Sequence, residues 1–248
     1  MDTIFNHRSI RQFENRPVEE AVLTRILEAG VLASTTGNMQ VYSMVVTTDS
    51  NVRNDLNACH FNQPATKAPV LITFCADFNR FEKWCKQRKA IPGYDNFHSF
   101  IVGVIDALLA SQNVSLEAEH LGLGICYLGT TTYTIDRIID LLQLPHGVVP
   151  ITTIALGYPS TPSEMTPRLP LDAVVHREVY HDYTPEDIDR IYAARDTEPL
   201  TQKLLEENGK ETLAQIFTEN RYTKADFVRI SLLLLDVLKK QGFMNNTI

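Results

Sequence analysis

Basic side chains gather near the start of the chain, in a pattern suited to binding phosphate. His7, Arg8, Ser9 and Arg11 lie within one short stretch, and Arg16 follows. Arginine presents a planar, permanently charged fork of N–H donors, and serine adds a hydroxyl, so this combination has the chemistry of a phosphate clamp. Short basic runs are also common as solvated arms. Charge alone therefore leaves both interpretations open.

Further stretches, in order and at matching spacing, make the chain resemble the FMN-dependent nitroreductase family. The resemblance is narrower to the oxygen-insensitive NADPH nitroreductase and flavin reductase branch of that family. It covers nearly the whole chain and is weakest over residues 200–222. The matching stretches are HRSIRQF at 7–13, ASTTGNMQ at 33–40, the Gln63 region with APVLITFCADFNR at 68–80, GLGICYLGTT at 122–131, and ALGYP with PRLP within 155–170.

The resemblance implies a set of FMN-binding residues and no catalytic side chain, because FMN carries the hydride chemistry. It places His7, Arg8, Ser9, Arg11 and Arg168 at the FMN phosphate. The branch often has a lysine two residues before that last arginine, where this chain has Thr166. The positions implied for the ribityl chain and ring edge are Thr35, Gly37 and Gln63, with Asn62 as an alternative to Gln63, and those implied for a backbone cradle are Tyr127, Leu128 and Gly129.

The same resemblance implies an α+β, nitroreductase-like fold with a central, mainly antiparallel sheet flanked by helices. It also implies an intertwined homodimer in which both chains build each flavin site. We expect one FMN-binding domain over residues 1–248, with residues 183–248 as a helical C-terminal extension that wraps the partner subunit; packing of this extension on its own chain is the alternative.

Apolar periodicity predicts the main elements independently of the resemblance. Helices are predicted after Pro17, from Asp77 to Lys89, from Asp95 to Leu121, from Ile135 to Leu142, and at 185 and 223 onward; strands are predicted at 44–47, 69–74, 125–130 and 148–157. The polar stretch from Arg195 to Arg221 reads as a solvated loop, with a mobile lid as the less favoured alternative.

The helix from Asp95 to Leu121 has an unusually wide apolar face. Asp106 and the polar run Ser111-Gln112-Asn113 make it a poor membrane span, so we expect a buried helix shared with a partner subunit. An ordinary central core helix remains the alternative.

Composition narrows the function classes. A chain of 248 residues with 44% hydrophobic content can bury a sizeable core without disulfides or metal. The net charge of -7 disfavours nucleic acid or an anionic membrane as a partner. Four scattered cysteines without a CxxC pair, and a start without a signal-like segment, indicate a reducing cytoplasm.

Several other sites are not supported by motifs. His176 and His181 lie five residues apart, which is not the spacing of a helical zinc pair, so we predict no metal. The sequence has no GxGxxG fingerprint, no P-loop and no GxSxG elbow.

The resemblance therefore implies an FMN-dependent oxidoreductase that transfers hydride from NAD(P)H, through bound FMN, to nitroaromatic or quinone acceptors by a ping-pong mechanism. NADPH is favoured over NADH, because cations of the C-terminal region can meet its extra phosphate. These cations are Arg195, Lys203, Lys210, Arg221 and Lys224. Two alternatives stay open: an NAD(P)H:flavin reductase that supplies reduced flavin, and a non-catalytic FMN-binding sensor protein.

Overall fold

The computed structural model describes residues 2–247 of the chain. These residues form two compact units. The first unit runs to Glu164 and resumes at Ile230, and the second spans Met165–Arg229.

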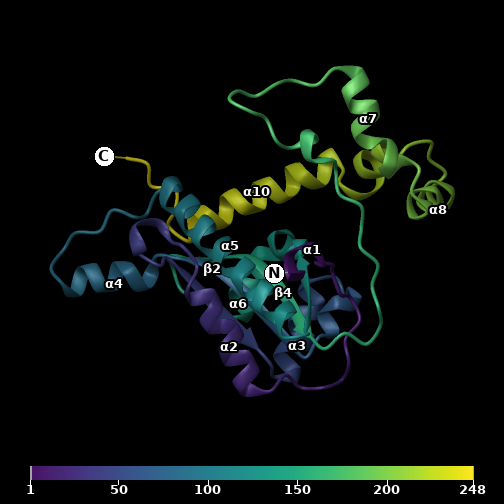
Figure 1. Ribbon diagram of the computed structural model, residues 1–248. Coiled ribbons are helices and arrows are strands. Elements are labelled where there is room, and N and C mark those ends of the chain that lie inside the picture. The colour runs from purple at the N-terminus through teal and green to yellow at the C-terminus, as the bar shows by residue number, and fades with distance from the viewer. Residues whose placement is uncertain (1, 248) are drawn as a thin grey trace. The chain divides into compact units, whose positions relative to one another are not determined.

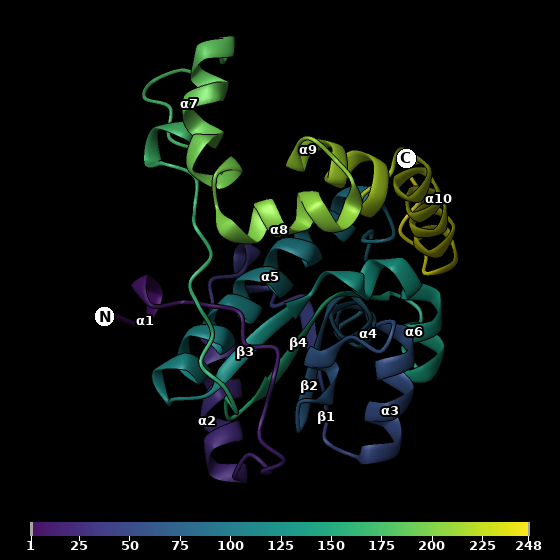
Figure 2. The same cartoon turned by 90° about the vertical axis from the view of Figure 1, so that its right-hand side faces the viewer.

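Four antiparallel strands form the sheet of the first unit, in the order β1-β2-β4-β3 (Figures 1 and 2). The two central strands carry mostly apolar side chains and are buried along almost their whole length. The strands are β1 (Tyr42–Thr47), β2 (Val70–Asp77), β3 (Gly124–Leu128) and β4 (Val148–Gly157). The predicted α+β class and antiparallel sheet are confirmed.

Helices cover both faces of this sheet, because successive side chains of each strand point to opposite sides. On one face α2 (Glu20–Val31) and α5 (Phe97–His120) pack over a core that includes Ile72, Phe74 and Ile154. On the other face α3 (Ser50–Cys59) and α6 (Ile135–Leu141) enclose a core that includes Leu71 and Ala155. Figure 2 shows α3 and α6 side by side.

Helix α5 contacts all four strands and is the central helix of the first unit. Among the described residues it is the one helix long and apolar enough to cross a membrane, and half of its most apolar window is buried, which is typical of a core helix. A row of its apolar side chains stays exposed in the single chain: Phe97, Ile101, Ile105, Leu108 and Leu109. The predicted shared helix of a homodimer accordingly stays a prediction.

Helix α3 was not among the predicted elements. Its sequence is mostly polar, and its stability comes from tertiary packing of Leu56 and Cys59 and from its N-cap, where the Asp49 carboxylate accepts from the backbone N–H groups of Asn51 (2.9 Å) and Val52 (3.1 Å). The helix predicted from Asp77 to Lys89 is present as α4, which is shorter at both ends (Asn79–Gln87).

The second unit contains helices where the sequence favoured a solvated loop. Residues 195–221 include α8 (Pro199–Asn208), the short α9 (Leu213–Gln215) and a π-helical turn (Ile216–Arg221), after α7 (Pro185–Asp196). The loop prediction is wrong because it weighed polarity over helix signals. Gly209 ends α8 in the left-handed conformation (φ 59°), and Thr212 and Gln215 form a capping box for α9.

Helix α10 (Lys224–Lys240) begins in the second unit and ends in the first. Val237, Leu238 and Phe243 are buried in a core cluster with Phe78 and Phe100 of the same chain. The end of the tail thus packs on its own chain, whereas the predicted wrapping of a partner by the rest of residues 183–248 stays a prediction.

Candidate functional site

The basic N-terminal segment, residues 7–13, runs as an extended arm along β3, an edge strand of the sheet. The Ile10 N–H donates to the Ile125 carbonyl of β3 (2.9 Å), and Phe13 forms a β-bridge with Pro159, just after β4. The Ser163 hydroxyl donates to the Ser9 carbonyl (3.2 Å). Backbone pairing therefore fixes the arm, and its charged side chains are free to meet a ligand.

A glycine in β3 lets the arm lie this close. A Cβ built on Gly124 would stand 2.5 Å from the Ile10 side chain, nearer than real Cβ atoms come to a neighbour. Ile10 is buried at this contact and anchors the middle of the arm.

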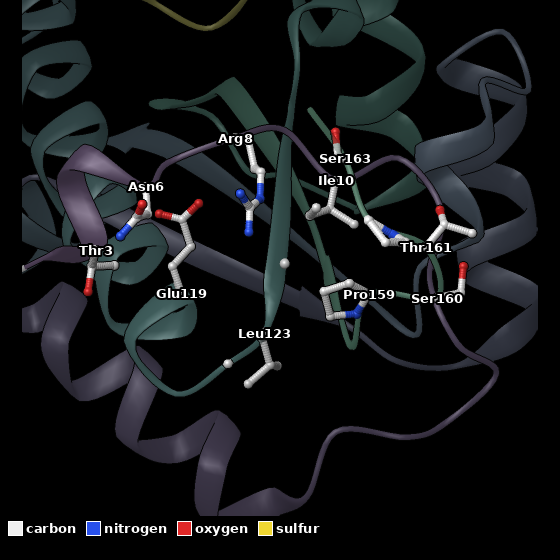
Figure 3. Close-up of a pocket in the computed structure, with 13 residues that line it drawn as sticks. Thr3, Asn6, Arg8, Ile10, Glu119, Leu123, Pro159, Ser160, Thr161 and Ser163 are labelled. Atoms are coloured by element: carbon white, nitrogen blue, oxygen red, sulfur yellow. The ribbon is translucent and has the colours of Figure 1, made fainter. Parts of the chain in front are cut away.

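Two adjoining pockets lie beside the arm. The larger, about 420 Å³, is lined by Arg8, Glu119 and the turn after β4, and Figure 3 shows Arg8 and Glu119 pointing toward the same space. The smaller, about 200 Å³, is lined by Ser9 and Arg11. Both share Ile10, Thr161, Pro162 and Ser163.

Two arginines without carboxylate partners make this region suited to binding an anion. Arg8 and Arg11 are exposed, and within residues 2–247 neither forms an ion pair with a carboxylate. Arg16 differs, since it donates to Glu19 (2.6 Å) and stacks over the Tyr158 ring at 3.9 Å. Hydrogen bonds from the Tyr158 hydroxyl and from Arg16 lower the pKa of Glu19 to about 2. Arg16 is therefore a structural contact between α2 and the end of β4.

His7 is oriented by Glu119 of α5, a residue that the sequence did not single out. Its Nδ1 lies 2.7 Å from Glu119 Oε1, and a carboxylate oxygen accepts, so the imidazole donates from Nδ1 and keeps Nε2 for another partner. Glu119 is one of two acids in the last turns of an apolar helix, with Glu117, and no local pattern sets it apart.

The segment with Thr35 and Gly37 is held by a second missed residue, Asp106. This carboxylate is fully buried in α5 and accepts from the backbone N–H groups of Thr36 (2.9 Å) and Val41 (3.2 Å). Gly37 adopts a positive φ of 57°, which glycine tolerates at no steric cost. The signal for Asp106 was its charge in the middle of an apolar helix, which sequence reasoning used only against a membrane span.

Gln63 lies beside the strand-to-helix turn that follows β3. Its Nε2 donates to the Thr130 hydroxyl (2.9 Å), and Thr130 follows Gly129 in the 3-10 helix Gly129–Thr134. The alternative residue, Asn62, is exposed and accepts from Asn57 Nδ2 (2.9 Å).

In the backbone-cradle segment that the resemblance proposes, the Tyr127 side chain points away into the core. Its hydroxyl lies within hydrogen-bond distance of Ser111 (3.0 Å) and Ser115 (3.1 Å) of α5, and burial raises the pKa of this phenol. Leu128 is fully buried, whereas Gly129 is exposed with open space where a Cβ would stand. Only the backbone of this segment, together with the bare face of Gly129, is thus placed to meet a ligand.

Arg168 lies in the second unit, where it is exposed and donates to the Thr166 carbonyl (3.2 Å). Its part in a phosphate site stays a prediction.

The structure brings some of the predicted residues together and not others. Arg8, Ser9 and Arg11 line the two adjoining pockets. His7 lines neither pocket but contacts Glu119, which lines the larger one. Neither pocket is lined by Thr35, Gly37, Gln63, or the segment 127–129. In the described part of the chain, no group of three or more His, Cys, Asp or Glu side chains is arranged to hold a metal.

Two unpaired guanidinium groups, a serine and a turn with three further hydroxyls form a donor set that fits a phosphate group. Comparison with known proteins agrees with this chemistry. The family model described as "Nitroreductase family" matches residues 4–158, which is more than half of the chain. The chain belongs to the nitroreductase family.

Relatives of this nitroreductase-family chain are named as reductases and oxidoreductases. The protein named "FMN reductase (NADPH)" of Bacillus subtilis is 34% identical over 189 residues, covering 75% of this chain and 76% of that protein. The crystal structure of a candidate oxidoreductase from Bacteroides fragilis has a TM-score of 0.97 at 50% identity, covering 99% of this chain and 100% of the other. The NfrA1 nitroreductase of B. subtilis has a TM-score of 0.86 at 30% identity and covers 99% of each chain.

These findings make the chain an NAD(P)H-dependent flavin oxidoreductase. The acceptor, the mechanism and the site residues go beyond them.

Proposed function

We propose that this chain binds FMN and reduces nitroaromatic or quinone acceptors with hydride from NAD(P)H. The observation that carries the proposal is the arm of residues 7–13, which presents Arg8, Ser9 and Arg11 to two adjoining pockets without a carboxylate partner for either arginine. A phosphate with two negative charges is the ligand that best complements this donor set. The N-terminal arm would thus hold the phosphate end of the cofactor, with Arg168 as a further donor.

In the proposed site the protein binds and orients and supplies no acid or base. FMN, when bound, would supply the hydride chemistry between nicotinamide and acceptor. His7, held through Nδ1 by Glu119, would turn Nε2 to the phosphate. The loop with Thr35 and Gly37 is fixed by Asp106, and Gln63 is held by Thr130; both would meet the ribityl chain and ring edge.

We further propose that the site is completed by a second copy of the chain. Thr35 and Gly37 line neither pocket of the arm, although their loop and the arm belong to the same unit. A two-chain site accounts for that separation, since the loop of one chain can face the arm of the other. The four free, buried cysteines agree with a reducing cytoplasm as the site of action.

NADPH is the proposed donor. The B. subtilis relative is named for NADPH. Of the five cations considered in the C-terminal region, Lys203 and Lys210 pair with Glu207 (3.7 Å) and Glu219 (2.5 Å). Arg195, Arg221 and Lys224 form no ion pair among the described residues. Arg195 lies over the Phe217 ring at 5.3 Å, so Arg221 and Lys224 are the better candidates for the extra phosphate.

A second candidate function is the reduction of free flavin for use by another enzyme. The name of the B. subtilis relative, FMN reductase, favours it. The two functions share the fold, the cofactor site and the donor, and they differ only in the acceptor that leaves reduced.

Steady-state kinetics tests the proposal. Initial rates are measured over a grid of NADPH and acceptor concentrations, with a nitroarene, a quinone and free FMN each used as acceptor. Parallel double-reciprocal lines with the nitroarene or quinone support one pocket that serves donor and acceptor in turn. Intersecting lines contradict it, because they require donor and acceptor to be bound together. Faster turnover with free FMN than with the other acceptors selects the flavin reductase.

A further inference from the structure

A buried polar group stands behind Gln63, outside the pockets of the arm. It comprises the imidazole of His60, which is the C-cap residue just after α3, and the hydroxyl of Thr130. His60 Nδ1 lies 2.8 Å from Thr130 Oγ1, and Gln63 Nε2 lies 2.9 Å from the same oxygen. The Gln63 amide nitrogen also donates to the His60 backbone carbonyl (3.3 Å).

These contacts decide which way the Gln63 amide faces. A backbone carbonyl only accepts, so the side of the amide that faces the His60 carbonyl must be the NH₂ group. With its two hydrogens directed at Thr130 and at that carbonyl, the opposite atom, Oε1, has no hydrogen-bond partner among residues 2–247. Gln63 is only half-buried, so a carbonyl acceptor is presented outward.

The imidazole of His60 holds the Thr130 hydroxyl in either neutral tautomer. If Nδ1 carries no hydrogen, the hydroxyl accepts from Gln63 and donates to His60; if Nδ1 carries one, the hydroxyl accepts from both. His60 is fully buried, so the ring has little room to turn. Burial also lowers the pKa of His60 to about 4, which keeps the ring neutral near pH 7.

The other ring nitrogen of His60 makes no hydrogen bond within residues 2–247 that would favour a histidine at this position. His60 Nε2 is buried without a hydrogen-bond partner in the described part of the chain. Such a group costs folding free energy, and an apolar side chain at this place would avoid the cost. The imidazole is therefore better explained by its polar contact with Thr130.

We propose that His60 and Thr130 are positioning residues that lock the Gln63 amide with its oxygen outward, where it accepts a hydrogen bond from the ring N–H of the flavin. This inference rests on the proposed function, in which Gln63 meets the ring edge. Oxidised flavin has a single ring N–H, at N3, so a fixed acceptor has only one place to bind on that edge. A freely rotating amide would present its donor as often as its acceptor.

The test uses FMN labelled with ¹⁵N at N3, bound to the full-length protein, and reads the N3 proton by NMR. In the wild type we expect a downfield N3–H signal that exchanges slowly with water. Thr130→Val keeps the shape of the side chain and removes the hydroxyl, so the amide can turn. We expect at least about tenfold faster N3–H exchange and about 2- to 10-fold weaker FMN binding, as the loss of one neutral hydrogen bond predicts.

Thr130→Ser restores the hydroxyl and should return both the signal and the affinity toward wild type. Gln63→Met, which removes the acceptor directly, should match Thr130→Val, and circular dichroism with thermal unfolding checks that each variant folds. An N3–H that exchanges equally fast in wild type, Thr130→Val and Gln63→Met overturns the inference while leaving FMN binding intact. A protein that binds no FMN at all overturns the proposed function instead.

Discussion

At the scale of the residue, the arginines of the arm do not pair within the described part of the chain, whereas the arginine just after it does. Arg8 and Arg11 have no carboxylate partner in the described residues, whereas Arg16 is tied to Glu19 and Tyr158. We expect Arg8→Ala and Arg11→Ala each to weaken FMN binding by roughly 10- to 100-fold, because each removes charge-assisted hydrogen bonds of about 1.5–3 kcal/mol. Fluorescence titration of FMN measures the Kd.

Arg16→Ala is the matched control for that prediction. It removes the same charge a few residues after the arm but takes away a contact with Glu19 instead of a ligand contact. We expect its FMN affinity to stay within about twofold of the wild type. If all three variants weaken binding equally, the arm acts only through its net charge and the assigned pockets are wrong.

The pH dependence of stability follows from His60. Burial lowers its pKa in the folded protein to about 4, below the ordinary value of 6.5 for histidine. Between these two pH values the unfolded chain binds a proton that the folded chain does not, so the free energy of unfolding falls as pH falls through this window and is restored above pH 6.5. The loss approaches about 3 kcal/mol on going from pH 7 to pH 4.

Urea unfolding of wild type and His60→Gln at pH 7, 5.5 and 4 measures this effect. The variant should lack the His60 share, so the stability difference between the two proteins should shift by about 3 kcal/mol across the window, in favour of the variant at low pH. A difference that stays constant with pH would show that His60 is charged or accessible in the folded protein.

Residues whose own side chains suit a ligand were predictable from the sequence. Residues that orient those side chains were not. The cluster from His7 to Arg11 stands out locally. Glu119, Asp106 and His60 contact residues far away in the chain, over separations of 112, 70 and 70 positions. No local pattern encodes such contacts, because they exist only once α5 and the strands have packed.

At the scale of the element, the arm depends on the close approach of Ile10 to β3. Gly124→Ala would place a methyl group against the Ile10 side chain and push the arm outward. We expect a loss of about 1–3 kcal/mol in the free energy of unfolding, together with weaker FMN binding, since the arm carries the arginines.

Gly93→Ala is the control for that change, because a Cβ there meets nothing within 4 Å and its backbone has no positive φ. Unfolding in urea and FMN titration of both variants make the comparison. Unchanged FMN affinity in Gly124→Ala would mean that the arm does not form the phosphate site.

The elements themselves were predicted where apolar periodicity is strong. Strand β4 was predicted over its full extent, 148–157, and α5 within two residues at its start, because each is an apolar run long enough to fix its own type. Helix α3 and the helices of residues 199–221 were missed, since their helical signal lies in capping and in a few buried contacts rather than in an apolar stripe.

At the scale of the whole molecule, the exposed apolar row on α5 favours a homodimer. Ile101, Ile105, Leu108 and Leu109 are each more than a third exposed in the single chain. We expect sedimentation of the wild type at micromolar concentration to give twice the chain mass of 28.0 kDa. Leu109→Asp should shift the protein toward monomer and lower FMN binding in parallel, because the proposed site needs both chains.

Asn54→Asp is a control for the same experiment, since it introduces an acid at an exposed position on α3, which covers the other face of the sheet. It should leave the mass unchanged. A monomeric wild type that retains its FMN would contradict the two-chain site.

The central claim, that this chain passes hydride from NAD(P)H to an acceptor through bound FMN, is tested most directly by anaerobic titration of the FMN-loaded protein. The account predicts a yellow protein with about one FMN per chain, whose visible flavin absorbance bleaches completely at one NADPH per flavin and returns when a quinone or nitroarene is added in the absence of NADPH. Flavin absorbance that NADPH leaves unchanged unless the acceptor is already present would contradict it, as would a protein that takes up no FMN.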